Sequence, residues 1–338
     1  MRLGAILVVR TKIEGAQDRA GLTLLADPLE CVEVVGRSVL ERTIDRFLDA
    51  GVESISVLVG PEMYQRRTPI PIRSRNITVQ VAHDLDVAIT EQLARHSRTG
   101  IDHCFVNSAN AYAETDLLDL FYFHREAKQP ITRAYDREGL LDLWVVDCSK
   151  AQSPNLDGLL TEKELTKDET DFSNGASYFI REYVKRLSHP RDLRQLAVDI
   201  LRGRCEQRPS GKEIRPGVWV GEGAEVHKPA RVVAPAYIGC GSSILEDSLI
   251  TRFSSIEKNC LVDCGTVIED SSILANTNIG IWLDVRHAIV EGNKILNLER
   301  DVMIEILDPS VIHSCLPVRD MHVGIGNHGR RWITASHR

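Results

Sequence analysis

The chain has 338 residues, 43% of them hydrophobic and 26% charged, which is enough for two ordinary domains that each bury a core. The formal net charge of −7 excludes a general attraction to nucleic acid or to an anionic membrane. The apolar run at positions 3–9 is too short for a membrane span and lacks a cleavage site, so we expect a cytoplasmic protein. The eight cysteines are scattered, and we expect buried free thiols.

Residues 3–180 alternate between apolar stretches of strand length and stretches with helical spacing. The run at 3–9 is continuously apolar, as in a strand buried on both faces, and the helical pattern at 39–49 is closed by Ala50-Gly51. This alternation predicts an open α/β sheet, mixed or mostly parallel, with right-handed crossovers. The predicted strands are 3–9, 54–59, 77–82, 103–107 and 141–146, and the predicted helices are 39–49 and 115–127.

The predicted sheet also predicts where a ligand binds. Ligands of such sheets bind beyond the carboxyl ends of the strands. The loop at 10–27 and the segment after Val106 are therefore the expected site. Three cationic side chains of that loop are candidates for binding nucleotide phosphates, namely Arg10, Lys12 and Arg19.

A change of composition marks the boundary between two domains. A polar stretch with helical character, 183–204, leads into Arg208-Pro-Ser-Gly, which is typical of a linker. We therefore divide the chain into an α/β domain at 1–182, a helical linker at 183–213, a repeat domain at 214–300, and a carboxyl-terminal cap or tail at 301–338.

The repeat domain has a period of six residues, which fits neither an α-helix nor a simple strand. It predicts three flat sides per coil, with one inward β-branched side chain on each side and small residues at the corners. We predict a left-handed parallel β-helix of four to five coils. The repeating positions are Ile214, Val220, Val226, Val232, Ile238, Ile244, Ile250, Ile256, Val262 and Ile268, followed after a slip of one by Ile273, Ile279 and Val285, and by a last fragment with Ile289 and Ile295.

Three segments carry a family resemblance. They are Gly4-Ala5-Ile6-Leu7, the segment Val34-Val35-Gly36-Arg37-Ser38 before a helix that ends in Ala50-Gly51-Val52, and Ile214-Arg-Pro-Gly-Val-Trp at the start of the repeats. Together they resemble the sugar-phosphate nucleotidyltransferases, especially the mannose-1-phosphate guanylyltransferase type with an appended β-helix. The resemblance covers most of the chain and implies attack by a sugar-1-phosphate on the α-phosphate of a nucleoside triphosphate.

The chain departs from this family where the chemistry is most demanding. Phosphate transfer needs glycines beside the phosphates, fixed cations and an aspartate that holds Mg²⁺. Val9 and Arg10 stand where the family has Gly-Gly, and the amide Asn110 lies near the expected aspartate. We therefore assign no metal ligand and expect Mg²⁺ only if the protein is catalytically active. The resemblance also implies four candidates for binding the sugar, Glu162, Lys163, Asn174 and Gly175.

These departures favour a catalytically impaired member of sugar-nucleotide metabolism of the GDP-mannose type, either a sensor or the partner of a catalytic subunit. Its expected ligand is a sugar nucleotide or a nucleoside triphosphate. An active sugar-1-phosphate nucleotidyltransferase is the first alternative. A hexapeptide-repeat acyltransferase is the second, with His287 as general base. Because a solenoid has open ends, we also expect a homo- or hetero-oligomer that forms through the β-helix.

Overall fold

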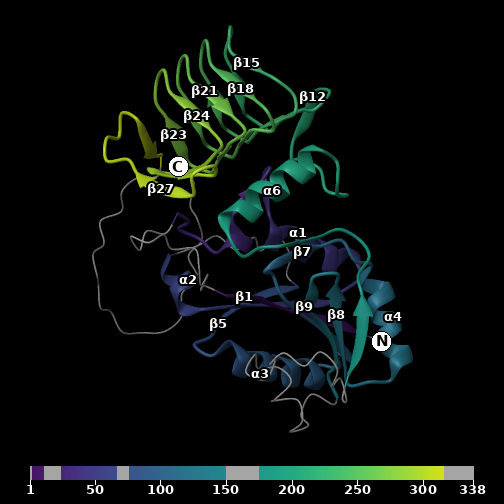
Figure 1. The fold of residues 1–338 in the computed structure, drawn as a ribbon. Helices are drawn as coiled ribbons and strands as arrows, with labels where there is room; N and C mark the ends of the chain where they lie inside the picture. Colours follow the sequence, from purple (N-terminus) through teal and green to yellow (C-terminus); the bar gives the residue numbers. More distant parts are fainter. Residues whose placement is uncertain (1, 11–23, 67–75, 150–174, 316–338) are drawn as a thin grey trace, which may run out of the picture.

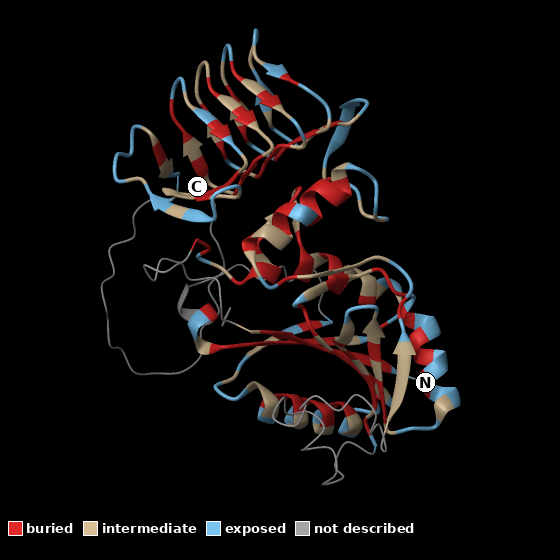
Figure 2. Ribbon diagram, viewed as in Figure 1, coloured by how far each residue is buried: buried red, intermediate tan, exposed pale blue. Residues whose placement is uncertain are grey.

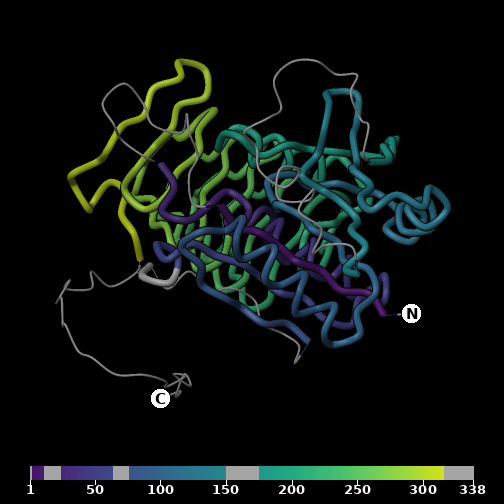
Figure 3. Tube along the Cα trace, turned by 90° about the horizontal axis from the view of Figure 1, so that it is seen from below, coloured from purple at the N-terminus to yellow at the C-terminus, as the bar shows by residue number. Residues whose placement is uncertain are grey.

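The computed structural model describes residues 2–10, 24–66, 76–149 and 175–315. These residues form an α/β region and a stack of short strands that lies over one side of it (Figures 1 and 3). None of the helices described is both long enough and apolar enough to cross a membrane.

The α/β region is built on a seven-stranded mixed sheet, in the order β10-β8-β9-β6-β1-β4-β5. The strand β1 is buried along its whole length, as its continuous apolar run predicts (Figure 2). Only β9 runs antiparallel to its neighbours, so the predicted mixed or mostly parallel sheet is confirmed. The strands are β1 (Leu3–Val9), β4 (Ser54–Val59), β5 (Ile77–Val81), β6 (His103–Ser108), β8 (Ile131–Asp136), β9 (Gly139–Asp147) and β10 (Ala176–Phe179).

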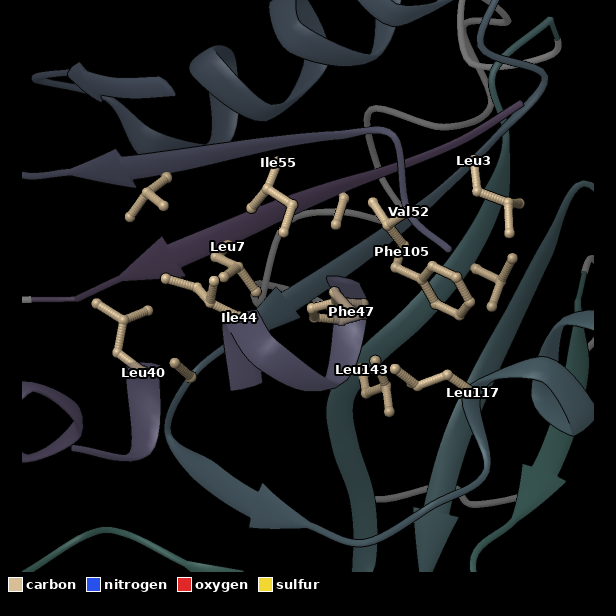
Figure 4. Close-up of a cluster of buried hydrophobic side chains, with 14 of the residues drawn as sticks. Leu3, Leu7, Leu40, Ile44, Phe47, Val52, Ile55, Phe105, Leu117 and Leu143 are labelled. Atoms are coloured by element: carbon tan, nitrogen blue, oxygen red, sulfur yellow. The ribbon is translucent and has the colours of Figure 1, made fainter. Parts of the chain in front are cut away.

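Helices cover both faces of this sheet. α1 (Val39–Asp49) and α4 (Leu117–Ala127) pack against the face that carries Leu7 and Phe105, which Figure 4 shows. α3 (Leu85–Arg98) packs against the opposite face. The remaining short helices are α2 (Pro61–Arg66) and the 3-10 turn η1 (Leu29–Cys31).

Several boundaries differ from the sequence-based prediction, and two of the differences have a clear local cause. The helix predicted at 115–127 begins at Leu117, because the Asp116 side chain accepts the backbone hydrogen bonds that cap it. The stretch predicted as helical at 183–204 begins instead as strand β11 (Val184–Arg186), which pairs with β7 (Ala111–Ala113). Only then does α6 (Pro190–Leu201) start, capped by His189.

Residues 212–314 form the stacked-coil region, in which strands about 18 residues apart pair in parallel and build three sheets. One sheet contains β13 (Val218–Val220), β16 (Ala236–Ile238), β19 (Ser255–Ile256), β22 (Ser272–Ile273) and β25 (Ala288–Glu291). The second contains β14 (Glu225–Val226), β17 (Ser243–Ile244), β20 (Leu261–Val262) and β23 (Thr277–Ile279), and the third β15 (Arg231–Val232), β18 (Leu249–Thr251), β21 (Val267–Glu269) and β24 (Asp284–Arg286). Antiparallel strands flank these sheets, namely β12 (Lys212–Arg215), β26 (Lys294–Asn297), β27 (Val302–Glu305) and β28 (Ile312–Ser314).

The inner side chains of the coils follow the predicted six-residue period through the middle of the stack. The positions from Ile238 to Ile279 are fully buried, and the slip to Ile273 is real, since Ile273 pairs with Ile256. The prediction is wrong at both ends. Ile214 is 56% exposed because β12 turns back antiparallel outside the coils.

At the far end of the stack, the residue that continues the inner column is Val290, which pairs with Ile273. Ile289, the position predicted for the repeat, faces the core between the two regions instead. Ile295 lies on β26, which forms an antiparallel hairpin with β25. In the last coil the inner position is therefore taken by Val290, one residue after the position that the six-residue period predicts.

α6 lies between the two regions and joins them through a shared core (Figure 1). That core combines Leu196 of α6 with Val35 of the hairpin β2 (Glu33–Val34) and β3 (Arg37–Ser38), and with Tyr237 of the coils. Since apolar side chains from both regions are buried together, the coils are fixed on the α/β region rather than tethered to it.

Candidate functional site

The carboxyl ends of β1, β4, β5 and β6 meet at one edge of the sheet, which we call the carboxyl edge. Arg10 follows β1, Gly60 follows β4, and Asn110 follows β6 shortly after that strand ends. The turn at 82–84 leads from β5 into α3. In a parallel arrangement these segments are where a ligand binds, so the carboxyl edge is the candidate site.

Two carboxylates of the chain itself contact Arg10. Its guanidinium Nη2 lies 3.5 Å from Oδ1 of Asp86, in the first turn of α3. Its backbone forms a hydrogen bond with the carboxylate of Glu30, whose side chain is buried. Burial raises the pKa of Glu30 to about 7, although the backbone hydrogen bonds at Glu30 and Arg10 act in the opposite direction. A backbone amide and a guanidinium are the groups that bind phosphate, and here both meet carboxylates.

A carboxylate of the chain also contacts the backbone N–H groups at the amino terminus of α3. The Asp84 side chain accepts hydrogen bonds from the backbone N–H groups of Asp86 and Val87, each at 3.1 Å. These donors and the helix dipole are what an anionic ligand would otherwise use. With a second carboxylate at Asp86, this end of the helix is acidic and disfavours a polyphosphate.

Asn110 and Asp142 meet on the next part of the carboxyl edge. The amide Nδ2 of Asn110 donates a hydrogen bond to Oδ2 of Asp142 at 2.7 Å. Asp142 lies on β9, which pairs with β6. Mg²⁺ can bind through as few as one protein carboxylate when substrate phosphates supply further oxygen ligands, and Asp142 provides one carboxylate here. Within the described residues, no group of three or more His, Cys, Asp or Glu side chains could hold a metal ion.

Most of the candidate residues from the sequence cannot be placed. Lys12, Arg19, Glu162, Lys163 and Asn174 lie outside the described residues. Arg10 is at the carboxyl edge, as its position after the first strand predicts. Gly175 directly precedes β10, at the far side of the sheet from β1.

Sequence reasoning missed the side chains that engage Arg10 and Asn110. Glu30, Asp86 and Asp142 lie in ordinary polar surroundings in the sequence, and nothing in their spacing distinguishes them. One signal was available: Asp86 falls in the first turn of a helix that follows a strand. Topology alone then places it at the carboxyl edge.

His287, the candidate base of the acyltransferase alternative, lies at the junction with α6. Its Nδ1 is 2.8 Å from Oδ2 of Asp270, and its Nε2 is 3.4 Å from Oε1 of Glu299. Asp270 also accepts a hydrogen bond from the buried Arg194 of α6 at 2.6 Å. Carboxylates therefore engage both ring nitrogens, and the network links α6 to the coils.

An open depression of about 530 Å³ lies at the opposite edge of the sheet. It is at the start of β6 and the end of β9, so it belongs to the amino ends of the parallel strands. It therefore lies away from the carboxyl edge. Its lining consists of Asp102, His103, Arg125, Asp147 and Ser149.

The segment 24–37, which carries Glu30, is held by carboxylates of the coils. Glu257 accepts hydrogen bonds from the backbone N–H groups of Val35 and Gly36, each at 2.9 Å. Glu291 accepts one from the backbone of Ala26 at 2.9 Å. The stacked-coil region therefore contributes directly to the position of one wall of the candidate site.

No protein-family model matches the chain, and no curated protein matches its sequence.

Proposed function

We propose that the protein belongs to the sugar-nucleotide nucleotidyltransferase-like proteins and binds a sugar nucleotide of the GDP-mannose type without transferring the nucleotidyl group. It would act as a sensor or as the partner of a catalytic subunit. The observation that carries this proposal is that carboxylates of the chain contact both the backbone and the side chain of Arg10. Its backbone meets Glu30 and its side chain meets Asp86, at the place where phosphates would bind.

Electrostatic repulsion disfavours a triphosphate at this edge of the sheet. A triphosphate that approached this edge would meet the carboxylates of Glu30, Asp84 and Asp86. These carboxylates already contact the donors at Arg10 and at the start of α3. A transfer enzyme needs those donors to stabilise the charge that develops on phosphate oxygens. A protein that binds a nucleotide mainly through its sugar and base depends less on these phosphate-binding donors. The segments that resemble the family support the same class of ligand.

Two further features belong to this proposal. We take the coils to be a left-handed β-helix, because a six-residue period with three short strands in each coil is typical of that solenoid, and we propose it as the platform for a partner subunit. We also place the protein in the cytoplasm. All eight cysteines are free, as in proteins of reducing compartments.

The test is a calorimetric titration of the whole chain at pH 8 with GDP-mannose and with GTP, with and without Mg²⁺. We expect saturable binding of GDP-mannose that does not depend on Mg²⁺. In the Glu30→Gln variant we expect several-fold tighter binding of GTP, because a carboxylate that competes with phosphate is neutralised. The control is Glu126→Gln on the exposed side of α4, which should change neither affinity. Absence of GDP-mannose binding at about 1 mM would sink the proposal.

An active nucleotidyltransferase is the second candidate, and the pair of Asn110 and Asp142 favours it. If the protein is active, these two side chains would hold Mg²⁺, which would neutralise charge on the phosphates. The Asp142→Asn variant separates the candidates. It should abolish Mg²⁺-dependent turnover if there is any, and it should leave Mg²⁺-independent binding of GDP-mannose unchanged.

A further inference from the structure

The outer side of α4 and the neighbouring edge strand β10 expose an apolar surface, which we call the α4/β10 face. It consists of Leu118, Tyr122 and Phe123 on α4, and Tyr178 on β10. Tyr122 is 55% exposed, Leu118 41% and Phe123 37%. Exposed aromatic clusters of this kind are typical of protein interfaces.

The face is continuous across the two elements. The rings of Phe123 and Tyr178 pack edge to face with centroids 5.4 Å apart, and the Tyr178 hydroxyl donates to Asp119 of α4 at 2.5 Å. These contacts hold the exposed rings in fixed positions, so little side-chain entropy would be lost when a partner covers them.

β10 also offers an unpaired strand edge. Within the described residues it pairs only with β8, at one end of the sheet. Its four residues, Ala176–Phe179, include no charge and no proline. Exposed edge strands are usually protected by such residues or covered by another element. Within the described residues the short edge of β10 therefore lacks both of these protecting residues, and the exposed rings of α4 lie beside it.

The charges on α4 indicate which partner fits. Asp116 and Asp119 lie near the amino end of the helix, and Arg125 and Lys128 lie at its carboxyl end, with Glu126 reducing but not reversing the positive charge there. Within the described part of the chain, neither Arg125 nor Lys128 forms an ion pair. Two copies of α4 packed antiparallel would place the acidic end of each against the basic end of the other, with Tyr122 at the centre.

We propose that the α4/β10 face is a two-fold symmetric contact between two copies of this chain. Such a contact is self-complementary in both its apolar centre and its charged ends, which is what an isologous dimer requires. In Figures 1 and 3, α4 lies at the opposite end of the molecule from β27 of the stacked coils. The dimer therefore leaves the coils free for the partner subunit.

Sedimentation velocity of the whole chain between about 1 and 100 μM tests this contact. The wild type should sediment as a dimer at the upper concentrations, and Tyr122→Glu should be monomeric throughout. The control is Val87→Glu, which changes a comparably exposed apolar residue on α3 and should stay dimeric. Circular dichroism would show that each variant keeps its fold. A wild type that is monomeric at 100 μM would overturn the proposal, and so would a Tyr122→Glu variant that remains dimeric.

A charge exchange tests the antiparallel arrangement itself. Arg125→Asp and Asp119→Arg should each weaken dimerisation roughly tenfold, because each places like charges opposite one another. The double variant should recover part of the wild-type affinity, since its charges are complementary again although the hydrogen bond from Tyr178 to Asp119 is lost. A double variant as weak as the sum of the two single variants would rule out this arrangement.

Discussion

Glu257 and Glu291 are the residues through which the stacked coils reach the candidate site. Glu257 is 1% exposed, and its two oxygens accept the backbone hydrogens of Val35 and Gly36. Burial raises the pKa of Glu257 to about 8 and that of Glu291 to about 7. Both groups therefore change their charge near neutral pH, and both hold the segment that carries Glu30.

The pH dependence of stability follows from the sign of these shifts. Because the folded pKa of Glu291 is about 7 and its ordinary value is 4.5, the folded state retains a proton that the unfolded state has lost. Its contribution to stability is therefore complete below about pH 4.5 and is lost as the pH rises to about 7. Asp27 nearby raises the pKa of Glu291 further, and Lys294 lowers it.

The Glu291→Gln variant should remove this dependence, since an amide does not titrate but can still accept the hydrogen bond from Ala26. We expect the free energy of unfolding of the variant, relative to wild type, to rise between about pH 5 and pH 8 by up to about 3 kcal/mol. Urea unfolding at several pH values measures it. A difference that stays constant with pH would show that the buried carboxyl of Glu291 is not the titrating group.

At the scale of elements, the corners of the coils depend on residues with a positive φ. One corner stacks Gly223, Gly241, Asn259 and Asn276, and the two asparagine side chains are hydrogen-bonded at 3.2 Å. Glycine and asparagine adopt this conformation at the lowest cost. Trp282 occupies another corner with φ of 56°, and its ring lies directly against Gly265 of the preceding coil.

Gly265→Ala should therefore be more costly than an equivalent change at an open corner. Both Gly265 and Gly223 have φ of 68°, but a Cβ at Gly265 would lie 2.5 Å from the Trp282 ring, whereas at Gly223 the nearest atom is 4.0 Å away. Both variants place a Cβ on a residue with positive φ, which strains the backbone. Only Gly265→Ala must also displace the Trp282 ring. We expect it to cost about 1–2 kcal/mol more in the free energy of unfolding. Equal costs in guanidinium unfolding would contradict the packing of Trp282.

The sequence predicts those elements whose pattern repeats or is continuously apolar. The bounds of β1, α1 and β4 and the inner column from Ile238 to Ile279 come directly from such patterns. β8 and β10 were missed because they mix polar and apolar residues, and β10 is half exposed at a sheet edge. β11 was hidden because its three residues include two cations.

The candidate site was predictable only in part, for a physical reason. Arg10 follows from topology, because it comes after the first buried strand. Its partner Asp86 is 76 positions away, and Glu291 is 265 positions from Ala26. Contacts over such separations depend on how the elements pack, which no local pattern encodes.

At the scale of the whole molecule, the two regions form one unit in which the coils shape the carboxyl edge. α6 fills the space between them, and the glutamates of the coils fix the segment 24–37. An arrangement of this kind can pass the binding of a partner on the coils to the candidate site, because that segment contacts both. The proposed sensor or partner subunit would use such a link.

The most direct test of the account is whether the protein transfers a nucleotidyl group. The purified chain with GTP, mannose-1-phosphate and Mg²⁺ should release no pyrophosphate above the rate without protein, because its own carboxylates contact the donors that the proposed phosphate site would need. Pyrophosphate release at about 1 s⁻¹ or faster, abolished in Asp142→Asn, would contradict the central claim.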